Sequence, residues 1–255
     1  MKLDSSGPEP APRHEYGAHG QAGHSRLSAV RGDHPAAGDS GADGVYDEAF
    51  WEAMYRSRSA AWSGRPNPQL VTEAAELTPG VALDVGCGEG ADAVWLAERG
   101  WQVTAIDISP TALQRAQAHA AQAGPTVAGR ITWLHADLMA EPQSLGSFAL
   151  VSAHFMQLPA AQRERLHRRL AAAVSPGGTL LVVGHHPSDV HAGVGRPHRP
   201  DLMFTAEQVA AVMQPDLWDI LVNESRARRV TDEQGVGRTV HDAILKARRR
   251  GRSDN

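Results

Sequence analysis

Two aspartates and a glycine-rich turn stand together in residues 81–109 and could bind a nucleotide-like ligand. Asp84 lies inside a short apolar run that is typical of a strand buried on both faces. Residues 86–90, GCGEG, follow directly. The three glycines of this turn have no side chains, so the backbone can approach a ligand closely. Asp107 stands near the end of the next apolar run, where a carboxylate can accept hydrogen bonds from both hydroxyls of a ribose. The spacing therefore predicts a ribose-containing ligand held between two strand ends.

Asp84 distinguishes between two kinds of ligand. The glycine pattern followed by Asp107 fits the loose fingerprint of dinucleotide-binding domains, so a nicotinamide-dependent oxidoreductase is one alternative. A carboxylate two residues before the first glycine would, however, repel a pyrophosphate. A ligand with a ribose and a cationic amino-acid end suits both aspartates, and S-adenosylmethionine has both features.

With these residues the chain resembles the class I S-adenosylmethionine-dependent methyltransferases, whose first motif is similar to LDVGCGEG at residues 83–90. The resemblance implies an α/β fold, a doubly wound, seven-stranded, mostly parallel Rossmann-like sheet with a C-terminal antiparallel hairpin. It also implies that the acid and the leucine after the third strand hold the adenine. The cofactor-binding residues implied within the sheet are Asp84, Gly86, Cys87, Gly88, Asp107, Ile108, Asp137, Leu138 and His154.

The remaining elements follow the alternation expected of such a sheet. Ser109 and Pro110 form a strong helix start, and Thr205 with Gln208 forms a capping box. Four arginines of one amphipathic helix are predicted to face solvent: Arg163, Arg165, Arg168 and Arg169. We predict helices over 68–77, 91–99, 110–123, 159–174 and 206–213. We predict strands over 81–85, 103–108, 131–135, 148–153, 179–184, 217–223 and 239–245.

Aromatic residues at helical spacing in residues 45–58 precede the irregular stretch AWSGRPNPQLV at residues 61–71. This segment looks like the N-terminal part of bacterial small-molecule methyltransferases related to the tellurite-resistance and thiopurine methyltransferase group. That resemblance implies that Tyr55, Trp62 and Arg65 contact the methionine end of the cofactor or the mouth of the substrate pocket. Packing of the two aromatic rings and a surface ion pair of the arginine are the alternatives.

Histidines follow the fourth and fifth predicted strands, where ligands bind in open α/β sheets. His154, His185 and His186 are candidate general bases, since histidine takes up a proton near neutral pH; a structural role at each strand end is the alternative. We predict an acceptor pocket walled by Trp62, His154, Phe155, His185, His186 and Phe204. The glycine- and proline-rich loop at residues 193–200 is expected to close above it.

The acceptor is predicted to be a small molecule: a thiol or other chalcogen, a phenol or an amine. HFMQ after the fourth strand differs from the Asn/Asp-Pro-Pro-aromatic stretch of enzymes that methylate amino groups of nucleic acids. The single cysteine, Cys87, rules out an intrachain disulfide and a cysteine-based zinc site, and we predict no metal site. A non-enzymatic module that binds the cofactor is a further alternative.

The charge and composition of the chain limit the partners and the location that we expect for it. The 255-residue chain has a formal net charge of −4, which argues against a general nucleic-acid binder. No apolar run is long enough to span a bilayer and there is no hydrophobic signal core, so no membrane partner and a cytoplasmic location are expected. Residues 1–44 are predicted to be a disordered extension, residues 45–248 the catalytic domain and residues 249–255 a basic tail, the basic run itself beginning at Lys246. The oligomeric state is left open.

Overall fold

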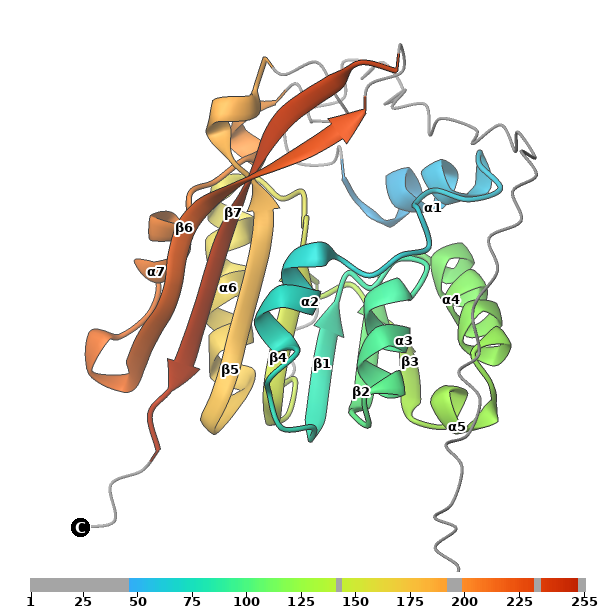
Figure 1. The fold of residues 1–255 in the computed structure, drawn as a ribbon, viewed down its shortest axis with the longest axis horizontal. Helices are drawn as coiled ribbons and strands as arrows, with labels where there is room; N and C mark the ends of the chain where they lie inside the picture. The colour runs from blue at the N-terminus through green and yellow to red at the C-terminus, as the bar shows by residue number, and fades with distance from the viewer. Residues whose placement is uncertain (1–45, 141–143, 192–198, 232–234, 252–255) are drawn as a thin grey trace, which may run out of the picture.

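The computed structural model of the chain describes residues 46–140, 144–191, 199–231 and 235–251. One seven-stranded sheet with the order β3-β2-β1-β4-β5-β7-β6 forms its centre (Figure 1). The strands are β1 (Val81–Val85), β2 (Gln102–Asp107), β3 (Ile131–His135), β4 (Phe148–His154), β5 (Val174–His185), β6 (Trp218–Thr231) and β7 (Gly237–Arg249). Strands β1 to β5 run parallel, and β7 runs antiparallel to both β5 and β6. The predicted fold class is confirmed.

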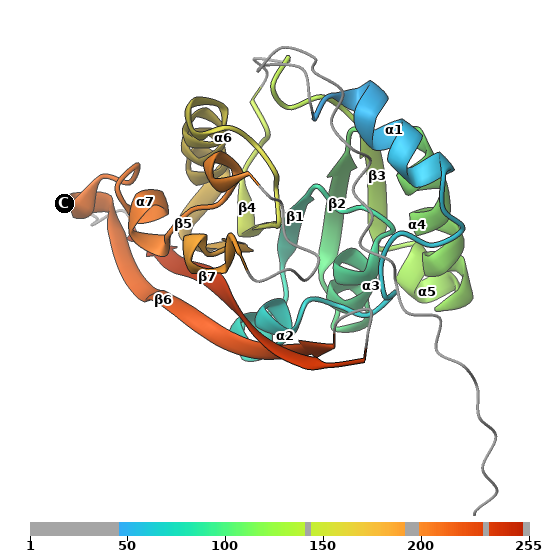
Figure 2. The same cartoon turned by 90° about the horizontal axis from the view of Figure 1, so that it is seen from above.

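Helices cover both faces of the sheet (Figure 2). They are α1 (Glu48–Arg56), α2 (Pro68–Ala74), α3 (Ala91–Glu98), α4 (Pro110–Gln122), α5 (Pro125–Ala128), α6 (Ala160–Ala173) and α7 (Ala206–Ala210). Helices α6 and α7 pack into the apolar cluster of one face, and α2 and α3 into that of the other. In β5, Leu180 and Val182 belong to the first cluster while Leu181 and Val183 belong to the second. This is why the central strands read as continuous apolar runs.

Helix α1 is attached to the first turn of α4 through Glu52. The Glu52 carboxylate accepts hydrogen bonds from the Ser109 hydroxyl and the Thr111 hydroxyl, both at 2.6 Å. Burial acts in the opposite direction, but these bonds and one from the Thr111 N–H lower the pKa of Glu52 to about 2. Ser109 is also the N-cap of α4, as predicted, and accepts the Ala112 N–H. A negative charge at this helix start is favourable because it satisfies free N–H groups there.

The ends of strands β5, β6 and β7 differ from the predicted ends because of how these strands pair with their neighbours. The Pro-Gly-Gly turn at residues 176–178 lies within β5, opposite a register shift between Phe148 and Leu150, so the strand begins at Val174 instead of after the turn. The hairpin strands β6 and β7 are each longer than predicted because they pair with each other beyond the end of β5. A short helix, α5, begins directly after Gly124. The predicted extension, residues 1–44, lies outside the described ranges.

The basic run from Lys246 is not a free tail. Residues 246–249 form the end of β7, and the Lys246 ammonium donates to the Glu73 carbonyl at 2.7 Å. Arg250 pairs with Asp219 at 2.8 Å. Hydrogen-bonded pairing with β5 and β6 makes this segment a strand, although its residues show no alternation of apolar and polar side chains.

One of the four arginines predicted to face solvent is buried. Arg163 is 6% exposed and donates to the carbonyls of Leu158 and Asp201, both at 3.0 Å. Its guanidinium lies 5.2 Å from the centre of the Phe204 ring. The prediction for Arg163 is therefore wrong: it is a buried cross-link between α6 and the segment before α7, whereas Arg165 and Arg168 are exposed.

None of the helices in the described ranges has the length and apolar character needed to cross a bilayer.

Replacing Gly184 with alanine should destabilise the protein by about 1–3 kcal/mol, because it overpacks the core. A Cβ at this position would lie 2.2 Å from the Phe204 ring. Urea denaturation of Gly184→Ala measures this, with Gly251→Ala as the control because nothing lies within 4 Å of that position. An unchanged midpoint for Gly184→Ala would show that Phe204 does not pack there.

Candidate functional site

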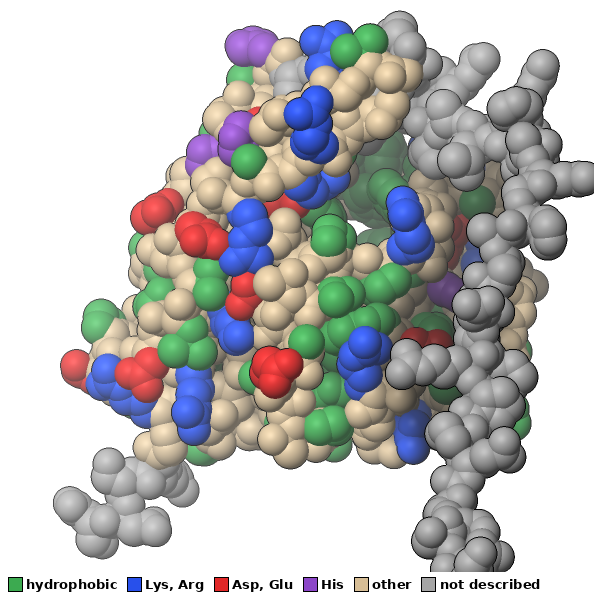
Figure 3. Space-filling view, viewed as in Figure 1, with side chains coloured by type: hydrophobic (Ala, Val, Ile, Leu, Met, Phe, Trp, Pro, Cys, Tyr) green, Lys and Arg blue, Asp and Glu red, His purple; other side chains and the backbone are tan. Residues whose placement is uncertain are grey.

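The carboxyl ends of β1 to β5 open into one cavity of about 1200 Å³. In the space-filling view a hollow with hydrophobic side chains inside it lies beneath the β6–β7 hairpin (Figure 3). All the cofactor-binding residues expected from the sequence line this cavity: Tyr55, Trp62, Arg65, Asp84, Gly86, Cys87, Gly88, Asp107, Ile108, Asp137, Leu138 and His154. Ligand pockets usually measure about 300–1,000 Å³, so the cavity has room for a cofactor and a second small molecule.

The glycines of the turn after β1 cannot carry side chains. Gly86 and Gly88 have φ values of 68° and 53°, a conformation that favours glycine. A Cβ at Gly86 would lie 2.2 Å from the Met156 sulfur, and one at Gly88 would lie 2.9 Å from the Tyr55 hydroxyl. Glycine is therefore required here so that Met156 and Tyr55 can pack directly against the backbone of the turn, which lines the cavity.

Asp107 joins this turn to the end of β2. One carboxylate oxygen accepts the Gly88 N–H at 2.8 Å and the other accepts the Ser109 N–H at 2.9 Å. Burial raises the pKa of Asp107, although these N–H bonds favour its charged form. Each oxygen keeps a further lone pair, so the carboxylate can still accept two hydroxyl groups. This arrangement fits the predicted ribose contact.

Asp84 at the end of β1, Asp92 in the first turn of α3 and His154 at the end of β4 form a mostly buried acidic cluster. One oxygen of each carboxylate and one ring nitrogen of the histidine all lie within 4.8 Å of one another. His154 Nδ1 lies 2.7 Å from an Asp92 oxygen. In the described part of the chain, the second oxygen of Asp84 and His154 Nε2 are buried without a hydrogen-bond partner.

The cluster perturbs the protonation of its members. Burial and then the charge of Asp92 raise the pKa of Asp84. Burial works against a charged His154, but its hydrogen bond to Asp92 and the nearby negative charges raise its pKa. Unpartnered buried polar atoms are unfavourable unless a ligand satisfies them. The ammonium group of an amino-acid ligand would satisfy the Asp84 oxygen, so the residues present fit S-adenosylmethionine.

The adenine contacts expected after β3 remain a prediction. Asp137 lies at the cavity, but its carboxylate accepts the Met139 N–H at 2.7 Å. Leu138 is buried beside it. The carboxylate keeps lone pairs for an adenine amino group.

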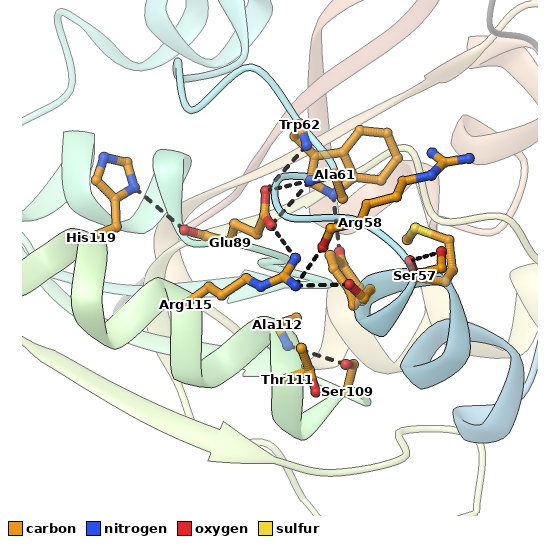
Figure 4. Close-up of polar contacts among 12 residues, drawn as sticks. Ser57, Arg58, Ala61, Trp62, Glu89, Ser109, Thr111, Ala112, Arg115 and His119 are labelled. Carbon is orange, nitrogen blue, oxygen red and sulfur yellow. Dashed lines mark hydrogen bonds and ion pairs between the residues drawn. The ribbon is translucent and has the colours of Figure 1, made fainter. Parts of the chain in front are cut away.

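Glu89 holds the N-terminal segment at the cavity (Figure 4). The sequence did not identify it as a functional residue. Its carboxylate accepts the N–H groups of Ala61 and Trp62 at 3.1 Å and pairs with Arg115 at 2.9 Å. Arg115 in turn donates to the carbonyls of Tyr55 and Arg58. Within the segment, the Trp62 indole N–H donates to the Tyr55 hydroxyl at 3.0 Å. The position of Glu89 inside a glycine-rich turn does not indicate that its partners, Ala61, Trp62 and Arg115, are distant in the sequence.

Only some of the residues predicted to wall the acceptor pocket line the cavity. Trp62, His154, Phe155 and His185 line the cavity, and the rings of Phe155 and His185 lie 4.6 Å apart. His186 and Phe204 are not among the lining residues. His186 instead accepts the Ser188 N–H and caps a short helical turn, and Phe204 is buried in the core. His185 is the last residue of β5 and stacks on Phe155, whereas His186 follows the strand and turns to Ser188, so only His185 lines the cavity. Residues 193–198 of the expected closing loop lie outside the described ranges.

Asp107→Asn should weaken binding of S-adenosylhomocysteine by roughly 1–3 kcal/mol, because the ribose hydroxyls lose a charged acceptor. Isothermal calorimetry measures this, and Asp219→Asn is the control because that exposed carboxylate pairs with Arg250 and does not line the cavity. Equal affinity of the native and Asp107→Asn proteins would remove the ribose assignment.

Glu89→Gln should speed hydrogen exchange at the Ala61 and Trp62 amides, because a neutral amide accepts these bonds more weakly than a carboxylate. Exchange mass spectrometry measures this, and cofactor affinity should fall several-fold with it. Unchanged protection of both amides would show that Glu89 does not hold the segment.

Comparison with known proteins agrees with this geometry. Residues 82–178 match a family model described as a methyltransferase domain. The chain is 32% identical over 160 residues to 2-heptyl-1-hydroxyquinolin-4(1H)-one methyltransferase of Mycobacteroides abscessus, covering 58% of this chain and 69% of that protein. It is 46% identical over 102 residues to an uncharacterized methyltransferase of Mycobacterium tuberculosis, and spans about half (48%) of that relative's length.

Solved structures show the same fold. A structure described under the conversion of a disulfide bond into a thioacetal group during echinomycin biosynthesis aligns with a TM-score of 0.62 and 24% identity, covering 81% of this chain and 94% of that one. TehB from Haemophilus influenzae aligns with a TM-score of 0.58 and 20% identity, covering 79% and 66%. Together with the bare glycine turn and the acids at three strand ends, these relatives establish that the chain belongs to the class I S-adenosylmethionine-dependent methyltransferases.

Proposed function

We propose that this enzyme methylates a hydroxyl oxygen of a small aromatic or heteroaromatic molecule, with His154 as the general base. The observation that carries the proposal is the pair formed by His154 and Asp92, with His154 Nε2 buried and unpartnered among the described residues. A hydroxyl needs to lose its proton on methylation, whereas an ionised thiol does not. A buried base at the cavity therefore favours the hydroxyl among the acceptors expected from the sequence.

The relative from Mycobacteroides abscessus supports this choice, since its named substrate is a 1-hydroxyquinolinone. The apolar side chains in the cavity suit such a ring. Leu138, Met156 and Leu158 contribute to that lining, together with Trp62. The proposed hydroxyl acceptor needs the base, and this need distinguishes it from the alternative thiol and amine acceptors.

Asp92 determines which nitrogen of His154 is the base. As a carboxylate it accepts a hydrogen bond from Nδ1–H, which leaves the lone pair on Nε2. Asp92 also accepts the Asn67 N–H at 2.6 Å, so its own position is fixed by the N-terminal segment. The carboxylates of Asp84 and Asp92 stabilise the imidazolium that forms when Nε2 takes the hydroxyl proton.

The bound cofactor supplies an electrophilic methyl group on a sulfonium. The chain's own task is to hold the acceptor oxygen near that group, exclude water and receive one proton on Nε2. Exclusion of water depends on the segment at Trp62, which Glu89 holds over the cavity.

Activity on a hydroxyl acceptor should rise with pH through a value above 6.5. His154 must be neutral to accept a proton, and its pKa is raised by Asp92, so the base is lost as pH falls below that raised value. In Asp92→Asn this limb should move to lower pH and the plateau rate should fall, because the neutral amide neither supports the imidazolium nor fixes the ring. The measurement is kcat/KM against pH with 1-hydroxyquinolin-4-one as the acceptor.

His154→Gln should lower kcat on the same acceptor by about 10²–10⁴-fold while leaving affinity for S-adenosylhomocysteine within a few-fold. His186→Gln is the matched control, since that histidine lies outside the cavity lining. With thiophenol, which is already ionised, the same variant should lose far less activity. Full activity of His154→Gln on the hydroxyl acceptor would overturn the assignment of the base.

A further inference from the structure

The cavity lining is divided by charge along the sheet. Asp84 and Asp107 lie within the last two residues of β1 and β2, and Asp137 follows β3. On the side of β4 and β5 the lining includes Arg199, Arg228 and Arg229, and a fourth arginine, Arg65, lines the cavity from the N-terminal segment. The acidic half suits the cationic sulfonium and ammonium groups of the cofactor. The basic half lies on the side of the sheet where His154 and His185 end their strands.

The basic half is built by the distal part of the β6–β7 hairpin. Strand β5 pairs with β7 only as far as His185 opposite Asp242. From there β6 and β7 pair only with each other, from Ala227 opposite His241 to Thr231 opposite Gly237. This part leaves the sheet and lies across the top of the domain (Figures 1 and 2). Both Thr231 and Gly237 line the cavity.

Contacts with α2 fix the hairpin in place. The Asp242 carboxylate is fully buried and accepts bonds from Arg228 Nε at 2.7 Å and Gln69 Nε2 at 3.3 Å. Arg226 donates to Gln69 at 2.8 Å and to Glu73 at 2.9 Å. A hairpin held by buried polar contacts can position a recognition group with little loss of freedom on binding.

The side chain of Arg229 is available to bind a ligand. Its side chain is exposed at the cavity and has no hydrogen-bond or ion-pair partner within the part of the chain that the structure describes. A Cβ at Gly237 would lie 3.1 Å from its guanidinium, so the guanidinium rests over a position without a side chain. By contrast, Arg199 pairs with Asp201 and Arg228 with Asp242.

We propose that the hairpin half of the cavity binds an anionic group of the methyl acceptor, a carboxylate in its simplest form, through Arg229. This inference rests on the proposed function, because it names the class of acceptor for the same site. A guanidinium binds a carboxylate through two parallel N–H donors, which fixes orientation as well as charge. An anionic acceptor opposite a cationic cofactor also matches the division of charge across the cavity.

The test measures binding without turnover. The probes are 4-hydroxyquinoline-2-carboxylate and its methyl ester, titrated calorimetrically into the full chain saturated with S-adenosylhomocysteine. The native protein should bind the carboxylate at least about tenfold more tightly than the ester, and the difference should shrink as sodium chloride is raised. Arg229→Glu should abolish the difference, and Arg229→Lys should retain part of it because the charge remains.

Arg248→Glu is the control, since Arg248 is exposed on β7 and is not a lining residue of the cavity. It makes the same change of net charge, and its preference for the carboxylate should stay native. Equal binding of acid and ester by the native protein, or an equal loss in Arg248→Glu, would overturn the proposal. Affinity for S-adenosylhomocysteine in all variants should remain native, which separates acceptor binding from cofactor binding.

The outcome is independent of the reaction assigned above. If the carboxylate binds through Arg229 but no hydroxyl compound is methylated, the anion site stands and the hydroxyl acceptor falls. If hydroxyl compounds are methylated but acid and ester bind alike, the hydroxyl acceptor stands and the anion site falls.

Discussion

The site depends on a turn where no side chain can be added. Three elements converge on the glycines after β1: the stretch after β4 contacts Gly86 through Met156, helix α1 contacts Gly88 through Tyr55, and helix α4 contacts Gly90 through Ala116. A Cβ at any of the three would lie under 3.0 Å from a neighbouring atom. Close packing leaves no room to adjust, so the turn sets the position of the three elements that contact it.

Buried carboxylates give this turn its chemical character. Asp107 is held by N–H groups of the chain itself, and Asp92 by Asn67 and His154. Asp84 keeps one oxygen without a partner among the described residues. A buried carboxylate with an unpaired oxygen contributes little to stability, but it can bind a cationic ligand well. The same cluster raises the pKa of the one buried histidine that adjoins it, which connects cofactor binding to the proposed base.

The upper walls are added to this floor by two long-range polar networks. Glu89 and Arg115 hold the N-terminal segment on one side, and Asp242 with Gln69 holds the β6–β7 hairpin on the other. Each network links residues far apart in the sequence around a carboxylate that is mostly or fully buried. These two networks add walls specific to this chain to a common fold. The proposed selectivity comes from the contrast between the acids at the ends of β1 to β3 and Arg229 on the hairpin.

The sequence by itself determined the fold and predicted the residues that we expect to hold the cofactor. Motif spacing placed Asp84, Asp107 and the glycines, because strand, turn and helix follow one another locally and each has its own residue signals. The tertiary structure alone decided the acceptor half. Glu89, Asp92 and Arg229 act through partners that are distant in sequence, and charged side chains of this kind look like solvated residues until folding places them. The two neighbouring histidines at the end of β5 show the same limit, since only their contacts in the folded chain decide that His185 lines the cavity and His186 does not.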